Sequence, residues 1–201
     1  NRKAQFTRSI VDSLALLGDV HFFENDYETA RRYYQEGSAF ANEQSFRPGG
    51  RPETDCLYGL SKIALKQGRL EEAAEFVQEA LKENERLGIR QVESALTLLG
   101  RIATAEGNCT QAVTELGRAL RVRIDISSDF PNTQLNDISD ILLAFTELWV
   151  KQGRYEQVVP VLGFLQEHLH AAYDRVTSEE LLDAVQTELS AKKLKALLNK
   201  G

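Results

Sequence analysis

The stretch that decides the fold reads Leu57-Tyr-Gly-Leu-Ser61 and continues, a few residues later, as Gly68-Arg-Leu-Glu-Glu-Ala73. Leu57 and Leu60 lie three residues apart, the spacing of neighbours on one face of a helix. Gly68 stands where that helix must end, because glycine adopts the left-handed conformation of a helix terminus at little cost. The stretch therefore predicts two helices joined by a tight turn, with the small Ala73 at their close crossing.

The same pattern occurs four times. In each copy the first Leu precedes the turn residue by 11 positions and the small residue of the second helix by 16. Successive copies start 43, 39 and 46 residues apart, as expected if insertions collect in the outer loops. The four sets are Leu14, Asn25 and Ala30; Leu57, Gly68 and Ala73; Leu96, Gly107 and Ala112; Leu142, Gly153 and Val158.

These residues resemble the tetratricopeptide repeat, over about residues 7–172. The resemblance implies an all-α fold, a right-handed α-solenoid of about four helix pairs. We expect the pairs at about 6–44, 54–86, 90–125 and 134–172. The small position of each first helix is taken by Gly18, Ser61, Gly100 and Thr146, and the last position of each second helix by Gly37, Ala80, Ala119 and Leu165.

The repeat pattern stops at about residue 172, and we expect C-terminal capping helices over 173–201. Thr177 and Glu180 have the spacing of a capping box, which predicts a helix that begins at about residue 177. A repeat array needs such a terminal element to cover its last apolar face. The alternative for this segment is a basic amphipathic helix that touches a membrane or a partner.

Composition excludes several kinds of protein. The 201 residues are 42% hydrophobic and carry a net charge of −6, and an acidic surface disfavours direct binding to nucleic acid. No apolar run reaches the roughly 18 residues needed to cross a membrane, and no signal peptide opens the chain. We therefore expect a cytoplasmic protein with no membrane contact. Since the chain has no methionine, we interpret it as a piece of a longer protein.

The residues that catalysis or metal binding would require do not occur in suitable patterns. The sequence has neither a phosphate-binding Gly-Lys-Ser/Thr loop nor a Gly-x-Ser-x-Gly elbow. Cys56 and Cys109 are predicted to be separate buried thiols, and His168 and His170 point to different faces of a helix. We expect no enzyme, no catalytic residue, no cofactor and no metal.

In the tetratricopeptide family the first helices line the concave, ligand-binding face. Carried over pair by pair, this implies a surface that is acidic at the first pair and basic in the middle. The expected ligand is a protein or an extended peptide whose acidic groups meet Lys62, Lys66 and Arg101. For each residue alone, a solvated helix face is an equally good interpretation. The candidate peptide-binding residues are Asp19, Phe22, Tyr58, Lys62, Lys66, Arg101, Glu147 and Lys151.

The long repeat periods resemble the C-terminal arrays of bacterial signal-transduction ATPases and transcriptional activators, and the segments 118–126 and 188–201 carry the same resemblance. It implies the regulatory sensor region of a larger signalling or transcription-regulating protein. The alternative is a free-standing scaffold that holds other proteins together. The sequence leaves the ligand, the pathway and the oligomeric state open.

Overall fold

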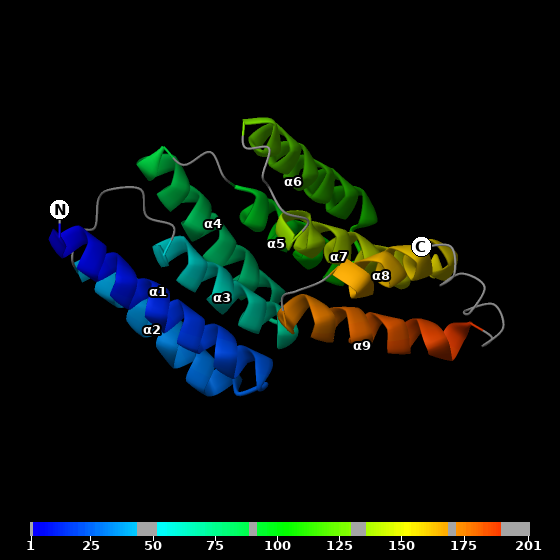
Figure 1. Ribbon diagram of the computed structural model, residues 1–201, viewed down its shortest axis with the longest axis horizontal. Helices are drawn as coiled ribbons and strands as arrows, with labels where there is room; N and C mark the ends of the chain where they lie inside the picture. The colour runs from blue at the N-terminus through cyan, green and yellow to red at the C-terminus, as the bar shows by residue number, and fades with distance from the viewer. Residues whose placement is uncertain (1, 44–51, 89–91, 130–135, 169–171, 190–201) are drawn as a thin grey trace. The chain divides into compact units, whose positions relative to one another are not determined.

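The computed structural model describes residues 2–43, 52–88, 92–129, 136–168 and 172–189, and all the secondary structure assigned to them is helical (Figure 1). This confirms the predicted all-α class. The chain divides into two compact units, residues 1–98 (unit 1) and 99–201 (unit 2), and the division falls inside α5. The helices are α1 (Arg2–Phe23), α2 (Tyr27–Glu43), α3 (Pro52–Lys66), α4 (Leu70–Leu87), α5 (Glu93–Ala105), α6 (Cys109–Asp129), α7 (Asn136–Lys151), α8 (Tyr155–His168) and α9 (Ala172–Glu188).

One turn geometry joins the two helices of every predicted pair. The turn residue has a positive φ each time: 59° at Asn25, 72° at Gly68, 80° at Gly107 and 69° at Gly153. The following residue donates its N–H to the carbonyl five positions earlier, a bond that satisfies a carbonyl left over at the end of the first helix. This confirms the four predicted turns. The bonds are Asp26 N to His21 O (2.9 Å), Arg69 N to Ala64 O (2.9 Å), Asn108 N to Ala103 O (2.8 Å) and Arg154 N to Trp149 O (2.9 Å).

Asp26 caps the second helix of the first pair. Its Oδ1 accepts a hydrogen bond from the Thr29 N–H at 3.2 Å. Hydrogen bonds from the side chain and backbone of Thr29 lower the pKa of the Asp26 carboxyl below its usual value of 3.8. A lowered folded-state pKa means that the capping contribution is complete above the unfolded pKa and is lost as the pH falls through the folded one.

We therefore expect the Asp26 carboxyl to titrate below an ordinary aspartate in an NMR titration of the side-chain carboxyl carbons. The Asp26→Asn variant keeps an amide oxygen as a cap but cannot titrate. Its stability relative to the unmodified chain should therefore rise in acid, once Asp26 becomes protonated. A midpoint at or above the ordinary aspartate value would contradict this.

Tyr34 of α2 is the central side chain of unit 1. It is 1% exposed, and its hydroxyl donates a hydrogen bond to Asp19 Oδ1 at 2.7 Å. Its ring lies against Gly18 of α1 and Gly59 of α3, where an added Cβ would come within 3 Å of the ring. The two glycines therefore let one aromatic ring contact two neighbouring first helices at once.

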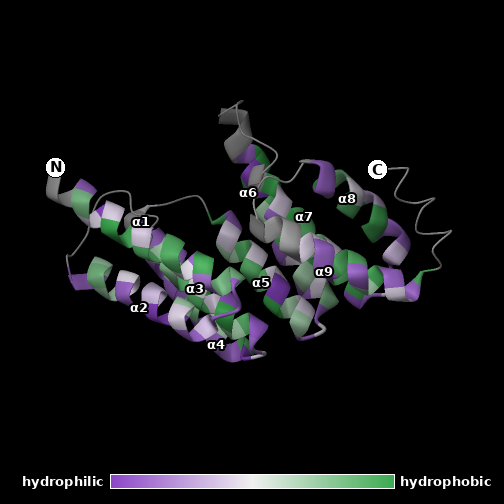
Figure 2. Cartoon of the chain, turned by 60° about the horizontal axis from the view of Figure 1, so that its bottom comes forward, coloured by the Kyte–Doolittle hydropathy of each residue, from purple (hydrophilic) through white to green (hydrophobic). Residues whose placement is uncertain are grey.

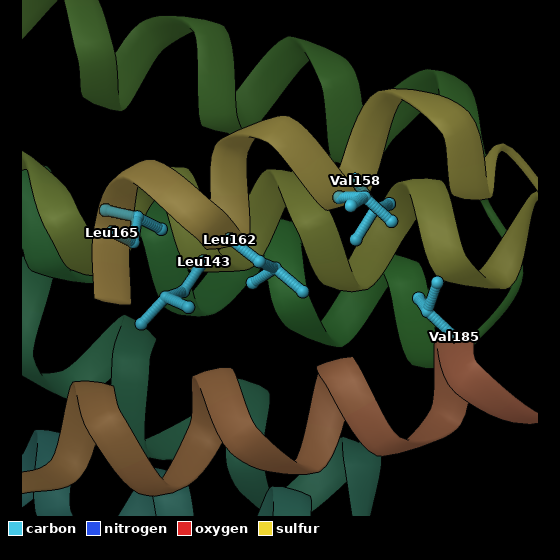
Figure 3. Packing of buried hydrophobic residues seen from close by; sticks show 6 residues of the cluster. Leu143, Val158, Leu162, Leu165 and Val185 are labelled. Carbon is cyan, nitrogen blue, oxygen red and sulfur yellow. The ribbon is translucent and has the colours of Figure 1, made fainter. Parts of the chain in front are cut away.

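In unit 2, the side chains that fill the space between α7, α8 and α9 come from all three helices (Figure 3). Thr146, Val158 and Leu165 replace the small residues of the other pairs, and each is fully buried. The Thr146 hydroxyl donates to Leu143 O at 2.7 Å, which satisfies the buried donor. The cluster consists of Leu143, Val158, Val159, Leu162, Leu165 and Val185.

The last described helix differs from the prediction at its start. α9 begins at Ala172, five residues before Thr177, and Thr177 and Ser178 are buried within it. The predicted capping box at Thr177 is therefore wrong, since residues 172–176 contain no glycine or proline to end or delay a helix. α9 packs against α7 and α8 through Val185. Of the predicted terminal segment, residues 190–201 lie outside the described structure.

Candidate functional site

The first helices present residues at a shared set of positions, which we call the first-helix face. In α3 these positions hold Asp55, Lys62 and Lys66, seven and four residues apart, so that they lie along one side of the helix. Asp55 and Lys66 are exposed, and Lys62 is half-buried. The equivalent positions are Asp12, Asp19 and Phe23 in α1, and Asp140, Glu147 and Lys151 in α7.

The aromatic residues predicted for this face are not exposed. Phe22 is 5% exposed, and its ring centroid lies 5.6 Å from that of Tyr27. The turn between α1 and α2 brings the two rings together. Tyr58 is 8% exposed, and its hydroxyl accepts a hydrogen bond from Asn84 Nδ2 of α4 at 3.0 Å. The expectation that Phe22 and Tyr58 offer exposed aromatic contacts is wrong, since both side chains pack within unit 1.

Arg101 is also buried, at 4% exposure. Its Nε donates to both carboxylate oxygens of Glu147, at 3.1 and 3.0 Å, and its Nη1 donates to Asp140 Oδ1 at 2.7 Å. The expectation of an exposed cation at Arg101 is therefore wrong. The guanidinium of α5 is instead held by two carboxylates of α7 within unit 2.

A signal for this ion-pair cluster was present in the sequence. Arg101 and Glu147 occupy equivalent places in consecutive repeats, and their charges are opposite. Because consecutive first helices of such an array pack side by side, opposite charges at equivalent places can pair with each other instead of facing a ligand. Sequence reasoning treated each position separately and missed the pairing.

The remaining candidates belong to both units of the chain. In unit 1, Lys62 and Lys66 lie on the solvent side of α3, and Asp19 lies half-buried on α1. The Asp19 carboxylate accepts the Tyr34 hydrogen bond and so also supports the core. In unit 2, Lys151 is exposed at the end of α7. The remaining candidates are thus a set on α1 and α3 of unit 1 and one exposed cation, Lys151, on α7 of unit 2.

Among the described residues, no group of three or more His, Cys, Asp or Glu side chains is placed to hold a metal ion. Cys56 is buried and Cys109 half-buried, and the two do not form a disulfide bond. Over the same ranges, none of the helices combines the length and apolar character needed to cross a membrane.

Comparison with protein families gives two matches. Residues 11–39, which include most of α1 and α2, and residues 54–87, which include most of α3 and all of α4, each match a model described as tetratricopeptide repeat. Comparison with curated proteins and with solved structures gave no match. Both matched segments lie in unit 1 and contain the first-helix faces of α1 and α3.

Proposed function

This chain carries tetratricopeptide repeats, which are protein-interaction modules, and from that premise we propose that unit 1 binds an extended peptide segment of a partner protein on the first-helix faces of α1 and α3. The partner segment carries acidic side chains, which contact Lys62 and Lys66 of α3. The observation that supports this most is the placement of these two lysines one helical turn apart on the solvent side of a matched repeat.

The charges on α1 predict which way round the proposed ligand lies on the two helices. α1 and α3 pack against each other, and the α1 positions equivalent to Asp55 and Lys62 are Asp12 and Asp19. A peptide that crosses both helices therefore meets carboxylates on α1 and ammonium groups on α3. We expect a ligand with acidic residues over α3 and a basic residue over α1, because like charges in contact oppose binding.

The Lys62→Glu/Lys66→Glu double variant tests the proposal. Two charge-assisted contacts become repulsive, so we expect affinity for acid-containing ten-residue peptides to fall by about tenfold or more. An array of such peptides, graded in charge, selects the probe, and fluorescence anisotropy measures its dissociation constant.

The matched control is Arg32→Glu/Lys82→Glu, which makes the same change of net charge on exposed positions of α2 and α4. It should keep nearly full affinity, apart from a small long-range effect that added salt removes. Equal loss in the two double variants would show only a general effect of charge. Unchanged affinity in Lys62→Glu/Lys66→Glu would reject the surface on α3.

We propose further that the module is the regulatory sensor region of a larger bacterial signalling or transcription-regulating protein in the cytoplasm. The long repeat periods and the segment 118–126 support this, because both resemble the arrays of such proteins. The sequence of the full-length protein tests it. A nucleotide-binding loop upstream is the expected finding, and an initiator methionine directly before Asn1 would contradict it.

A further inference from the structure

The first helix has an apolar side that the described structure leaves open to solvent. Phe6 is 68% exposed, Leu16 64%, Val20 51% and Leu17 43%. Hydrophobic residues recur along the whole length of α1 (Figure 2), whose opposite side packs on α2 and α3. On this side, six residues recur at alternating intervals of three and four, which is the spacing of residues that contact a second helix in a coiled coil. We call this set the stripe. The stripe is Phe6, Ser9, Ser13, Leu16, Val20 and Phe23.

The matched repeats identify the kind of element that covers such a side. Leu16, Leu17 and Val20 are equivalent to Gly59, Leu60 and Ile63 of α3. Those three are buried, because that side of α3 packs on the preceding helices α1 and α2. Leu16 and Val20 of the stripe are thus equivalent to residues of α3 that are covered by the preceding helices.

The covering element cannot be a helix pair like α1–α2 in the same arrangement. Gly59 accommodates the Tyr34 ring, and a Cβ at that position would clash with it. In α1 the equivalent residue is Leu16, so a second helix carrying a tyrosine at the place of Tyr34 would meet a leucine side chain. The partner helix must instead offer a small residue opposite Leu16.

α1 itself offers such residues at the middle of the stripe. The Ser13 hydroxyl donates to Ser9 O at 2.7 Å, and the Ser9 hydroxyl donates to Gln5 O at 3.0 Å. A buried hydroxyl without a hydrogen bond is costly, whereas these two already have acceptors on their own helix. Ser9 and Ser13 can therefore lie against another helix at close approach without an unsatisfied donor.

We propose that the stripe is a self-association surface, on which α1 packs antiparallel against α1 of a second copy of this chain. The two helices cross at Ser13, next to the two-fold axis. In this arrangement Phe6 lies opposite the second copy's Val20, and Leu16 and Leu17 lie opposite its Ser9 and Ile10. Large side chains thus meet small or apolar ones.

Charges at the edge of the stripe favour the same arrangement. Arg8 of one copy lies opposite Asp19 of the other, and the two-fold axis produces this pair twice, so the dimer and the peptide of the proposed function compete for Asp19. Within each chain Arg8 Nε also lies 3.7 Å from Asp12 Oδ2, which offsets the approach of the two Asp12 carboxylates near the axis. The apolar exposed area is on the order of 400–500 Å² per chain, which is typical of a weak, reversible dimer.

Sedimentation equilibrium tests the proposal. The chain should show a reversible monomer–dimer equilibrium with a dissociation constant in about the micromolar range. Leu16→Glu and Val20→Glu should each weaken dimer association by about tenfold or more, because the glutamate charge would be buried between the two copies of α1. Val113→Glu is the matched control on α6, where Val113 is 52% exposed, and should leave the equilibrium unchanged.

Disulfide trapping tests the register without depending on the stability of those variants. In a Cys109→Ser background, Ser13→Cys should yield a cross-linked dimer under mild oxidation, since Cβ atoms at the crossing come within disulfide reach. Gln35→Cys, exposed on α2, is the control and should cross-link far more slowly. A chain that stays monomeric at its highest soluble concentration overturns the proposal. Equal cross-linking at positions 13 and 35 overturns it as well.

Discussion

Replacing Tyr34 with alanine is expected to lower the free energy of unfolding of unit 1 by about 3–5 kcal/mol, the usual cost of deleting a buried aromatic side chain. The ring is 1% exposed and lies against Gly18 and Gly59 on two different helices. Its loss leaves a cavity that the glycines cannot fill, because they have no side chains. Urea unfolding, followed residue by residue through amide hydrogen exchange in unit 1, measures the change.

Tyr34→Phe is the matched control. It keeps the ring and removes only the hydroxyl that donates to Asp19, a part-buried bond at 2.7 Å, so the expected cost is about 1 kcal/mol. If Tyr34→Ala were no more destabilising than Tyr34→Phe, the ring would not hold α1, α2 and α3 together as described.

The second large effect is expected in unit 2. Arg101→Ala leaves the carboxylates of Asp140 and Glu147 next to each other without their cation, and should destabilise this unit by about 2–4 kcal/mol. The expected value is below that for a fully buried pair, because the two carboxylates remain 36% and 26% exposed. The chain's single tryptophan, Trp149, lies on α7, so its fluorescence reports the unfolding of unit 2 in urea.

Two comparisons make the Arg101 prediction specific. Arg118→Ala removes an arginine whose side chain is 56% exposed and paired with Glu115, and should cost less than about 0.5 kcal/mol. Arg101→Ala should also leave peptide binding by unit 1 unchanged, because the guanidinium is buried in unit 2. A wild-type stability together with weakened peptide binding would instead favour the exposed ligand contact that the sequence suggested.

The turns and the small crossing positions were predictable because they depend on single residues with few alternatives. Asn25 and the three turn glycines were identified from backbone preference, and each has the positive φ that the prediction required. Ala30, Ala73 and Ala112 were placed at helix crossings from their spacing, and each is fully buried. The backbone preference of single residues and the constant spacing within each repeat were sufficient to predict these features.

The candidate surface was less predictable because exposure depends on what a side chain meets across the fold. Tyr58 and Lys62 lie on the same stretch of α3, yet Tyr58 is 8% exposed and accepts a hydrogen bond from Asn84 of α4, whereas Lys62 is half-buried. Arg101 has the position of an exposed residue in the repeat pattern, yet two acidic residues of another helix pair with it. Neither contact is encoded in the spacing of one helix.

The start of α9 was missed for a related reason. Thr177 and Glu180 have the spacing of a cap, but five helix-compatible residues precede them. A capping pattern predicts a boundary only where the preceding residues disfavour a helix. Thr177 and Ser178 are therefore buried within α9 and do not cap its start.

The most direct test of peptide binding on the first-helix faces is an NMR titration of backbone amides with the acid-containing peptide chosen from the array. We expect shift changes that concentrate on α3 around Asp55, Lys62 and Lys66 and on α1 around Asp12 and Asp19. These changes should disappear in Lys62→Glu/Lys66→Glu. Shift changes confined to α2 and α4, or to unit 2, would contradict it.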